Sequence, residues 1–128
     1  MGLSFCARDF RGILRKNPNL PFFSSLPSCL SFLHNLIISS TFITASLTRV
    51  CLSRNVLYEG SGSLLASMLK NNVVLIHLDL SVNKLGTKGI VDLAAGLAKN
   101  VALQELNLKS NRIGSEAVSQ IPVMCQSN

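Results

Sequence analysis

Residues 75–86 read LIHLDLSVNKLG, and 28 residues later residues 103–114 read LQELNLKSNRIG. Residues 47–58, LTRVCLSRNVLY, precede them at the same spacing and match less closely. The two better copies keep apolar residues and asparagine in register, at Leu75, Leu78, Leu80, Asn83 and Leu85, and again at Leu103, Leu106, Leu108, Asn111 and Ile113. A period of about 20–50 residues is typical of stacked repeats, in which each unit buries its apolar face against its neighbours.

The positions within one copy predict a strand, a turn and a helix. Leu78 and Leu80 alternate with polar residues, so both point to the core face of a short strand. Asn83 follows where the chain turns, and its side-chain amide can satisfy buried backbone groups there. Gly86 permits a positive φ before the helix, and Thr87 is a plausible N-cap. The apolar residues that follow have helical spacing: Ile90, Leu93, Ala94 and Leu97.

This pattern, LxxLxLxxNxLG followed by GxxxLAxxLxxN, resembles the leucine-rich repeats of the ribonuclease-inhibitor type, such as those in NOD-like receptor arrays. The resemblance covers residues 47–121. It implies an α/β fold, a short solenoid of two to three repeats at residues 47–128 with parallel strands inside and helices outside. Pro122 stands where the second copy has Ala94, and the sequence stops six residues later. We therefore expect a truncated fragment of a longer repeat protein.

Residues 1–46 do not follow the repeat and predict an irregular or weakly helical segment. No Lys, Arg, Asp or Glu occurs from Asn17 to Thr48, and residues 20–33 use only five residue types. Three alternatives remain open for residues 17–48. Residues 29–48 are long enough to span a membrane, although His34 and many hydroxyl side chains weaken insertion. The stretch could instead form a cap over the first repeat, or be non-native sequence translated from a pyrimidine-rich intron end.

Composition limits the classes of function. The formal charge is +6, from 12 basic and six acidic side chains, and aromatic residues make up 5% of the chain. Because no basic stripe with interleaved aromatics occurs, we expect no nucleic-acid partner. The four cysteines are loosely spaced and form no CxxC motif, which argues against a zinc site or a disulfide framework. Reduced thiols fit a cytoplasmic location. No metal or cofactor is expected.

Candidate site residues lie beside the leucines of each strand and share the opposite, concave face. In register they form three rows across neighbouring strands: Arg49, His77 and Glu105, then Cys51, Asp79 and Asn107, then Ser53, Ser81 and Lys109. The predicted partner-binding residues are Arg49, His77, Asp79, Ser81, Glu105, Asn107 and Lys109. A solvated sheet surface with weak ion pairs is the alternative. A hydrolase-like set of His77, Asp79 and Ser81 is disfavoured, because residues i and i+4 of one strand lie about 13 Å apart.

The resemblance therefore implies a non-catalytic module that binds a protein partner through the concave face. One alternative is a GTPase-activating or other regulatory fragment, since Ran GTPase-activating proteins have similar repeats. The other is an adaptor anchored to a membrane through residues 29–48.

Overall fold

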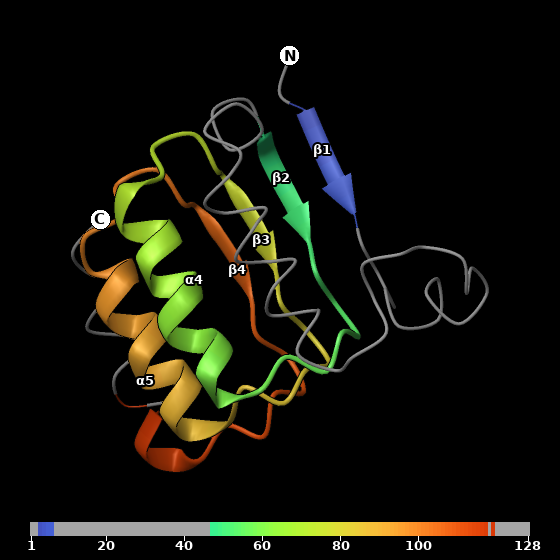
Figure 1. Cartoon of the computed structure of the whole chain (residues 1–128), viewed down its shortest axis with the longest axis vertical. Helices are drawn as coiled ribbons and strands as arrows, with labels where there is room; N and C mark the ends of the chain where they lie inside the picture. Colours follow the sequence, from blue (N-terminus) through green and yellow to red (C-terminus); the bar gives the residue numbers. More distant parts are fainter. Residues whose placement is uncertain (1–2, 7–46, 118, 120–128) are drawn as a thin grey trace, which may run out of the picture.

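The computed structural model describes residues 3–6, 47–117 and 119 (Figure 1). Its elements follow the chain in the order β1 Leu3–Cys6, β2 Leu47–Cys51, α4 Glu59–Asn71, β3 His77–Asp79, α5 Gly86–Leu97 and β4 Glu105–Asn107. From β2 onward, strands and helices alternate, as the 28-residue pattern predicts. A further helical turn begins at Ser115, in the third copy.

The strands form one parallel sheet in the order β1-β2-β3-β4. Arg49 pairs with His77, and His77 pairs with Glu105, so partners in β2, β3 and β4 are 28 residues apart. The predicted register is thereby confirmed. Strand β1 pairs with β2 and was not predicted, because residues 3–6 carry no copy of the repeat.

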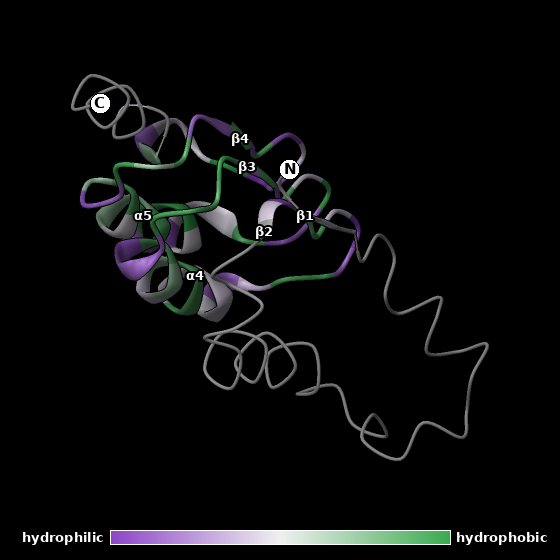
Figure 2. Cartoon of the chain, turned by 90° about the horizontal axis from the view of Figure 1, so that it is seen from above, coloured by the Kyte–Doolittle hydropathy of each residue, from purple (hydrophilic) through white to green (hydrophobic). Residues whose placement is uncertain are grey.

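Both helices pack against the same face of the sheet (Figures 1 and 2). The core lies between the two layers and is built almost entirely from leucine: Leu52, Leu57, Leu65, Leu69, Leu75, Leu78, Leu80, Leu85, Ile90 and Leu93 are buried. The corresponding residues of the third copy pack against this cluster but are only partly buried: Leu103, Leu106, Leu108 and Ile113. They are less covered because β4 is the last strand of the sheet.

Helices α4 and α5 lie side by side, and glycine allows their backbones to approach (Figure 1). A Cβ placed on Gly96 would lie 2.5 Å from both the Cα and the carbonyl oxygen of Ala66. A Cβ on Gly62 would overlap the backbone of Gly89. Any larger residue at Gly62 or Gly96 would therefore push the two helices apart.

Buried asparagine side chains join the turns of successive repeats. The Asn83 Oδ1 accepts hydrogen bonds from the backbone N–H of Asn55 (2.9 Å) and Leu57 (3.1 Å), both in the preceding turn. Its Nδ2 donates to the carbonyls of Leu52, Leu80 and Ser81 at 2.8–3.2 Å. The predicted role of this amide in satisfying turn backbone groups is confirmed.

Two more asparagines, Asn72 and Asn100, connect the turns that follow the helices. Asn72 is the C-cap of α4, and its Oδ1 accepts from the N–H of Val74 and Leu75. The Asn100 Nδ2 reaches back to the carbonyls of Leu69 (2.7 Å) and Asn72 (2.8 Å). Asparagine side chains thus connect successive repeats by hydrogen bonds both before and after the helix.

The turn before α5 differs in one respect from the prediction. Gly86 does have a positive φ, of 64°, but Leu85 is the N-cap, and no side chain caps the helix. Thr87 was wrongly predicted as the N-cap, because its Oγ1 instead accepts a hydrogen bond from the N–H of Gly114 at 3.0 Å. Its hydroxyl therefore connects two repeats rather than closing one helix.

The three alternatives for residues 17–48 fall outside the described residues, except that Leu47 and Thr48 begin β2. No helix within the described part of the chain has the length and apolarity needed to cross a bilayer.

Candidate partner-binding face

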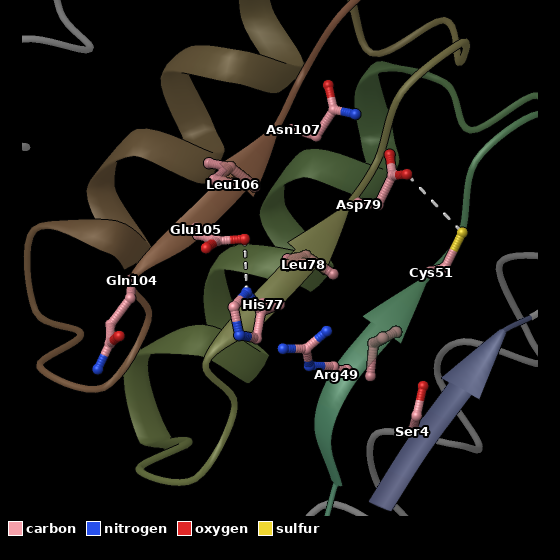
Figure 3. Close-up of a pocket in the computed structure, with 11 residues that line it drawn as sticks. Ser4, Arg49, Cys51, His77, Leu78, Asp79, Gln104, Glu105, Leu106 and Asn107 are labelled. Carbon is pink, nitrogen blue, oxygen red and sulfur yellow. Dashed lines mark hydrogen bonds and ion pairs between the residues drawn. The ribbon is translucent and has the colours of Figure 1, made fainter. Parts of the chain in front are cut away.

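The face of the sheet opposite α4 and α5 holds most of the predicted site residues (Figure 3). A shallow groove of about 640 Å³ runs across the four strands there. Its lining comes from all of them, with Ser4 on β1, Arg49 and Cys51 on β2, His77 and Asp79 on β3, and Glu105 and Asn107 on β4. The alternation of side chains along each strand brings these residues to one surface.

One row of this face is a cross-strand pair with a cation beside it. The Nδ1 of His77 lies 2.6 Å from the Oε2 of Glu105, and the two side chains point toward each other in Figure 3. The His77 side chain is 25% exposed and that of Glu105 is 73% exposed. Arg49 pairs with His77 along the backbone and is exposed. This row therefore presents a carboxylate and a guanidinium on either side of an imidazole.

In the next row, Cys51, Asp79 and Asn107, the side chains form hydrogen bonds within the sheet and its turns. The Sγ of Cys51 lies 3.8 Å from the Oδ2 of Asp79, while the Oδ1 of Asp79 accepts from the N–H of Ser81 at 2.9 Å. Asn107 repeats the second contact one strand further on, since its Oδ1 accepts from the N–H of Lys109 at 3.1 Å. Asp79 and Asn107 thus close the turns after their own strands. Asn107 remains exposed, whereas Asp79 is partly buried.

The third predicted row is not a continuous surface. Ser81 is 8% exposed and Ser53 is 3% exposed, whereas Lys109 is exposed. Ser81 lies just past the end of β3 and is buried, so it adds little accessible surface to this face. The prediction that it belongs to an accessible patch needs this correction.

The hydrolase-like set is not brought together. His77 is bonded to Glu105, and the Oδ1 of Asp79 is bonded to a backbone N–H. Within residues 3–6, 47–117 and 119, no cluster of three or more His, Cys, Asp or Glu side chains could hold a metal ion. The chemistry on this face is that of hydrogen bonding and charge.

Two polar lining residues, Gln104 and Ser4, lie outside the predicted rows. Gln104 is exposed and precedes β4, outside the alternation that identified the rows. Its backbone N–H donates to the carbonyl of Ile76 at 2.9 Å, which extends the pairing of β3 and β4 by one residue. Ser4 belongs to β1, which has no counterpart in the repeat pattern.

Comparison with known proteins supports the repeat assignment. A family model described as leucine-rich repeat matches residues 71–94 and 99–121, again 28 residues apart. No curated protein matches the chain by sequence. Among solved structures, one titled "Leiomodin-1 Actin-Binding Site 2 (ABS2)" is similar, with a TM-score of 0.66 and 20% identity. The match covers 86% of this chain and 62% of the leiomodin chain, so this chain spans less than two-thirds of that length. The likeness shows a shared fold, and the two segments that match the leucine-rich-repeat model lie within a parallel sheet backed by helices.

Proposed function

We propose that this chain is a non-catalytic interaction module that binds a protein partner through the face of its sheet opposite α4 and α5. The observation that carries the proposal is the row formed by Arg49, His77 and Glu105, which the sheet holds in register and in which Arg49 and Glu105 are exposed. We also propose that the repeats are of the ribonuclease-inhibitor-like type and stack as a short solenoid.

The physical argument rests on rigidity and mixed charge. The backbone beneath the row is fixed by the strand ladder and by further bonds beyond it, such as Leu52 N–H to the Asp79 carbonyl (2.8 Å) and Leu80 N–H to the Asn107 carbonyl (2.9 Å). A fixed backbone lowers the entropy lost on binding. The guanidinium and the carboxylate offer donors and acceptors in one patch, which favours a polar, mixed-charge protein surface.

The leiomodin structure names an actin-binding site, and actin is therefore the first partner that we propose to test. A photo-crosslinking side chain would be placed at Gln104, which lines the sheet-face groove, and separately at Ser67, an exposed residue of α4. Irradiation with actin, and then with a cell extract, should give covalent protein adducts from position 104 and not from position 67. Adducts from position 67 alone, or none from position 104, would contradict binding through the sheet face.

Nothing in the described residues favours GTPase activation over simple binding. We also propose that the protein is located in the cytoplasm, because its loosely spaced cysteines are best explained as reduced thiols.

A further inference from the structure

A second groove, of about 470 Å³, lies at the edge of the molecule where the chain leaves the strands. It is lined by residues from the turns after β2, β3 and β4: Arg54, Val56, Val82, Asn83, Lys84 and Arg112. None of these residues lines the sheet-face groove. The two grooves are therefore separate surfaces of the same repeats.

The lining of this turn groove, as we name it, is basic and apolar. Arg54 and Arg112 are exposed, and the Nζ of Lys84 lies 5.7 Å from the centre of the Tyr58 ring. No acidic side chain lines the groove, and in the described part of the chain none of the three cations forms an ion pair. Val82 adds an apolar surface that is 46% exposed.

The backbone that carries these side chains is held in place. Arg54 N–H donates to the Ser81 carbonyl (3.0 Å), Val82 N–H to the Lys109 carbonyl (2.8 Å) and Lys84 N–H to the Leu57 carbonyl (2.7 Å). The Asn83 amide, which also lines the groove, is engaged by five backbone groups. The backbone at Arg54 and Lys84 is therefore fixed before any ligand binds, which lowers the part of the entropic cost of binding that comes from the main chain.

We propose that the turn groove docks an acidic segment of a protein partner, with an apolar side chain of that segment against Val56 and Val82. Charge complementarity is the basis: Arg54, Lys84 and Arg112 line one groove with two valines, and among the described residues no carboxylate lines it or forms an ion pair with these cations. Positions 56, 84 and 112 are equivalent in successive repeats, and neighbouring strands lie about 4.8 Å apart. Arg54 and Arg112 come from turns two repeats apart, so their backbones are separated by about 10 Å, which is the rise of three residues of an extended peptide at about 3.3 Å per residue.

The valines distinguish a peptide from a nucleic acid. A phosphate backbone would use the cations alone, whereas base recognition needs aromatic rings or base-edge contacts along the groove. The only aromatic ring near these cations among the described residues, Tyr58, is already paired with Lys84. The apolar strip therefore favours an aliphatic side chain flanked by carboxylates.

The test measures fluorescence anisotropy of a labelled peptide with the core Glu-Leu-Glu-Glu, added to the whole purified chain at low salt. The wild-type chain should bind it, and cores of Gln-Leu-Gln-Gln and Glu-Ser-Glu-Glu should each bind more weakly. The double change Arg54→Glu and Arg112→Glu should weaken binding by at least about tenfold, because two attractive charges become repulsive. A milder pair, Arg54→Gln and Arg112→Gln, should weaken it by a smaller factor.

The matched control reverses two exposed cations outside the groove, Lys70→Glu and Lys99→Glu, which gives the same net charge. It should leave peptide binding within about twofold of wild type, and so should Glu105→Gln on the sheet face. Equal weakening by both double reversals, or no binding by the wild-type chain, would overturn the proposal. So would a single-stranded oligonucleotide of equal charge that displaces the peptide at a lower concentration than unlabelled peptide does. Sheet-face binding is measured separately, by crosslinking from position 104, so failure here and failure of sheet-face binding are distinguishable.

Discussion

Asn83 joins two repeats through a single side chain. Its amide makes five hydrogen bonds to backbone groups of its own turn and the preceding one, and the residue is 4% exposed. Asn83→Ala would leave several buried donors and acceptors without partners. We expect it to lower the free energy of unfolding by about 3 kcal/mol, since each unsatisfied buried group costs about 1–3 kcal/mol. Urea unfolding followed by circular dichroism measures this loss.

Asn107→Ala is the control for this change, because Asn107 is exposed and its side chain accepts one backbone hydrogen bond, from Lys109. Its cost should be at most about 1 kcal/mol. Similar losses for Asn83→Ala and Asn107→Ala would contradict the role assigned to the buried amide.

Val82 adopts a backbone conformation that disfavours a β-branched side chain, with φ at 55°. Its side chain is 46% exposed, so little burial is lost when it is replaced. Asparagine tolerates the left-handed region, and Val82→Asn should therefore raise the free energy of unfolding by about 1 kcal/mol. The corresponding change at Val101, which is 81% exposed and has no positive φ, should give no gain. If Val82→Asn lowers the urea midpoint, the turn conformation described here is wrong.

Helices α4 and α5 depend on glycine at their contact. Gly96→Ala would improve helix propensity by about 1 kcal/mol, yet its Cβ would lie 2.5 Å from the Ala66 backbone. Backbone atoms cannot rotate away, so overpacking should prevail and lower the free energy of unfolding by about 1–2 kcal/mol.

Gly60→Ala is the matched change on α4, because nothing lies within 4 Å of a Cβ at that position. It should be neutral or stabilise by up to about 0.5 kcal/mol. Thermal melts of the two variants provide the comparison, and a stabilising Gly96→Ala would show that the helices do not pack as described.

The sequence predicted the elements whose residues recur at a fixed spacing. Leu78, Leu80 and Asn83 have counterparts in the neighbouring copies, and this identified the strand, its buried face and the pairing of His77 with Arg49 and Glu105. Strand β1 escaped prediction because residues 3–6 have no such counterpart and lie about forty residues before β2 along the chain. A periodic pattern reports only those strands that share it.

Two further features, the burial of Ser81 and the turn groove, could not be predicted from the sequence because they depend on the path of the chain between elements. Alternation placed Ser81 on the open face, but the chain turns just after β3 and buries it. The turn groove is lined by Arg54, Lys84 and Arg112, which come from three separate turns. Four of its lining residues have a left-handed backbone conformation: Arg54, Val56, Val82 and Arg112. A sequence pattern of apolar spacing carries no information on these dihedral angles.

At the scale of the whole molecule, one leucine core supports both proposed surfaces. Leu80 is fully buried between the sheet and the helices. Leu80→Asp would place a carboxylate there without a partner and should abolish cooperative unfolding, together with binding at either groove. His77→Ala should leave the melt close to that of wild type, since the His77 side chain is partly exposed and contacts the exposed Glu105. A cooperative melt retained by Leu80→Asp would mean that the repeat register is wrong.

The most direct test of the account is residue-resolved amide hydrogen exchange on the whole purified chain. The backbone N–H groups of Leu52, Leu80 and Val82 donate to carbonyls one repeat away, at 2.8–2.9 Å. Stacked repeats predict slow exchange at these three amides, at rates that fall together with global stability when denaturant is varied. Exchange at these amides as fast as in an unfolded chain would contradict the stacking, and with it both surfaces proposed here.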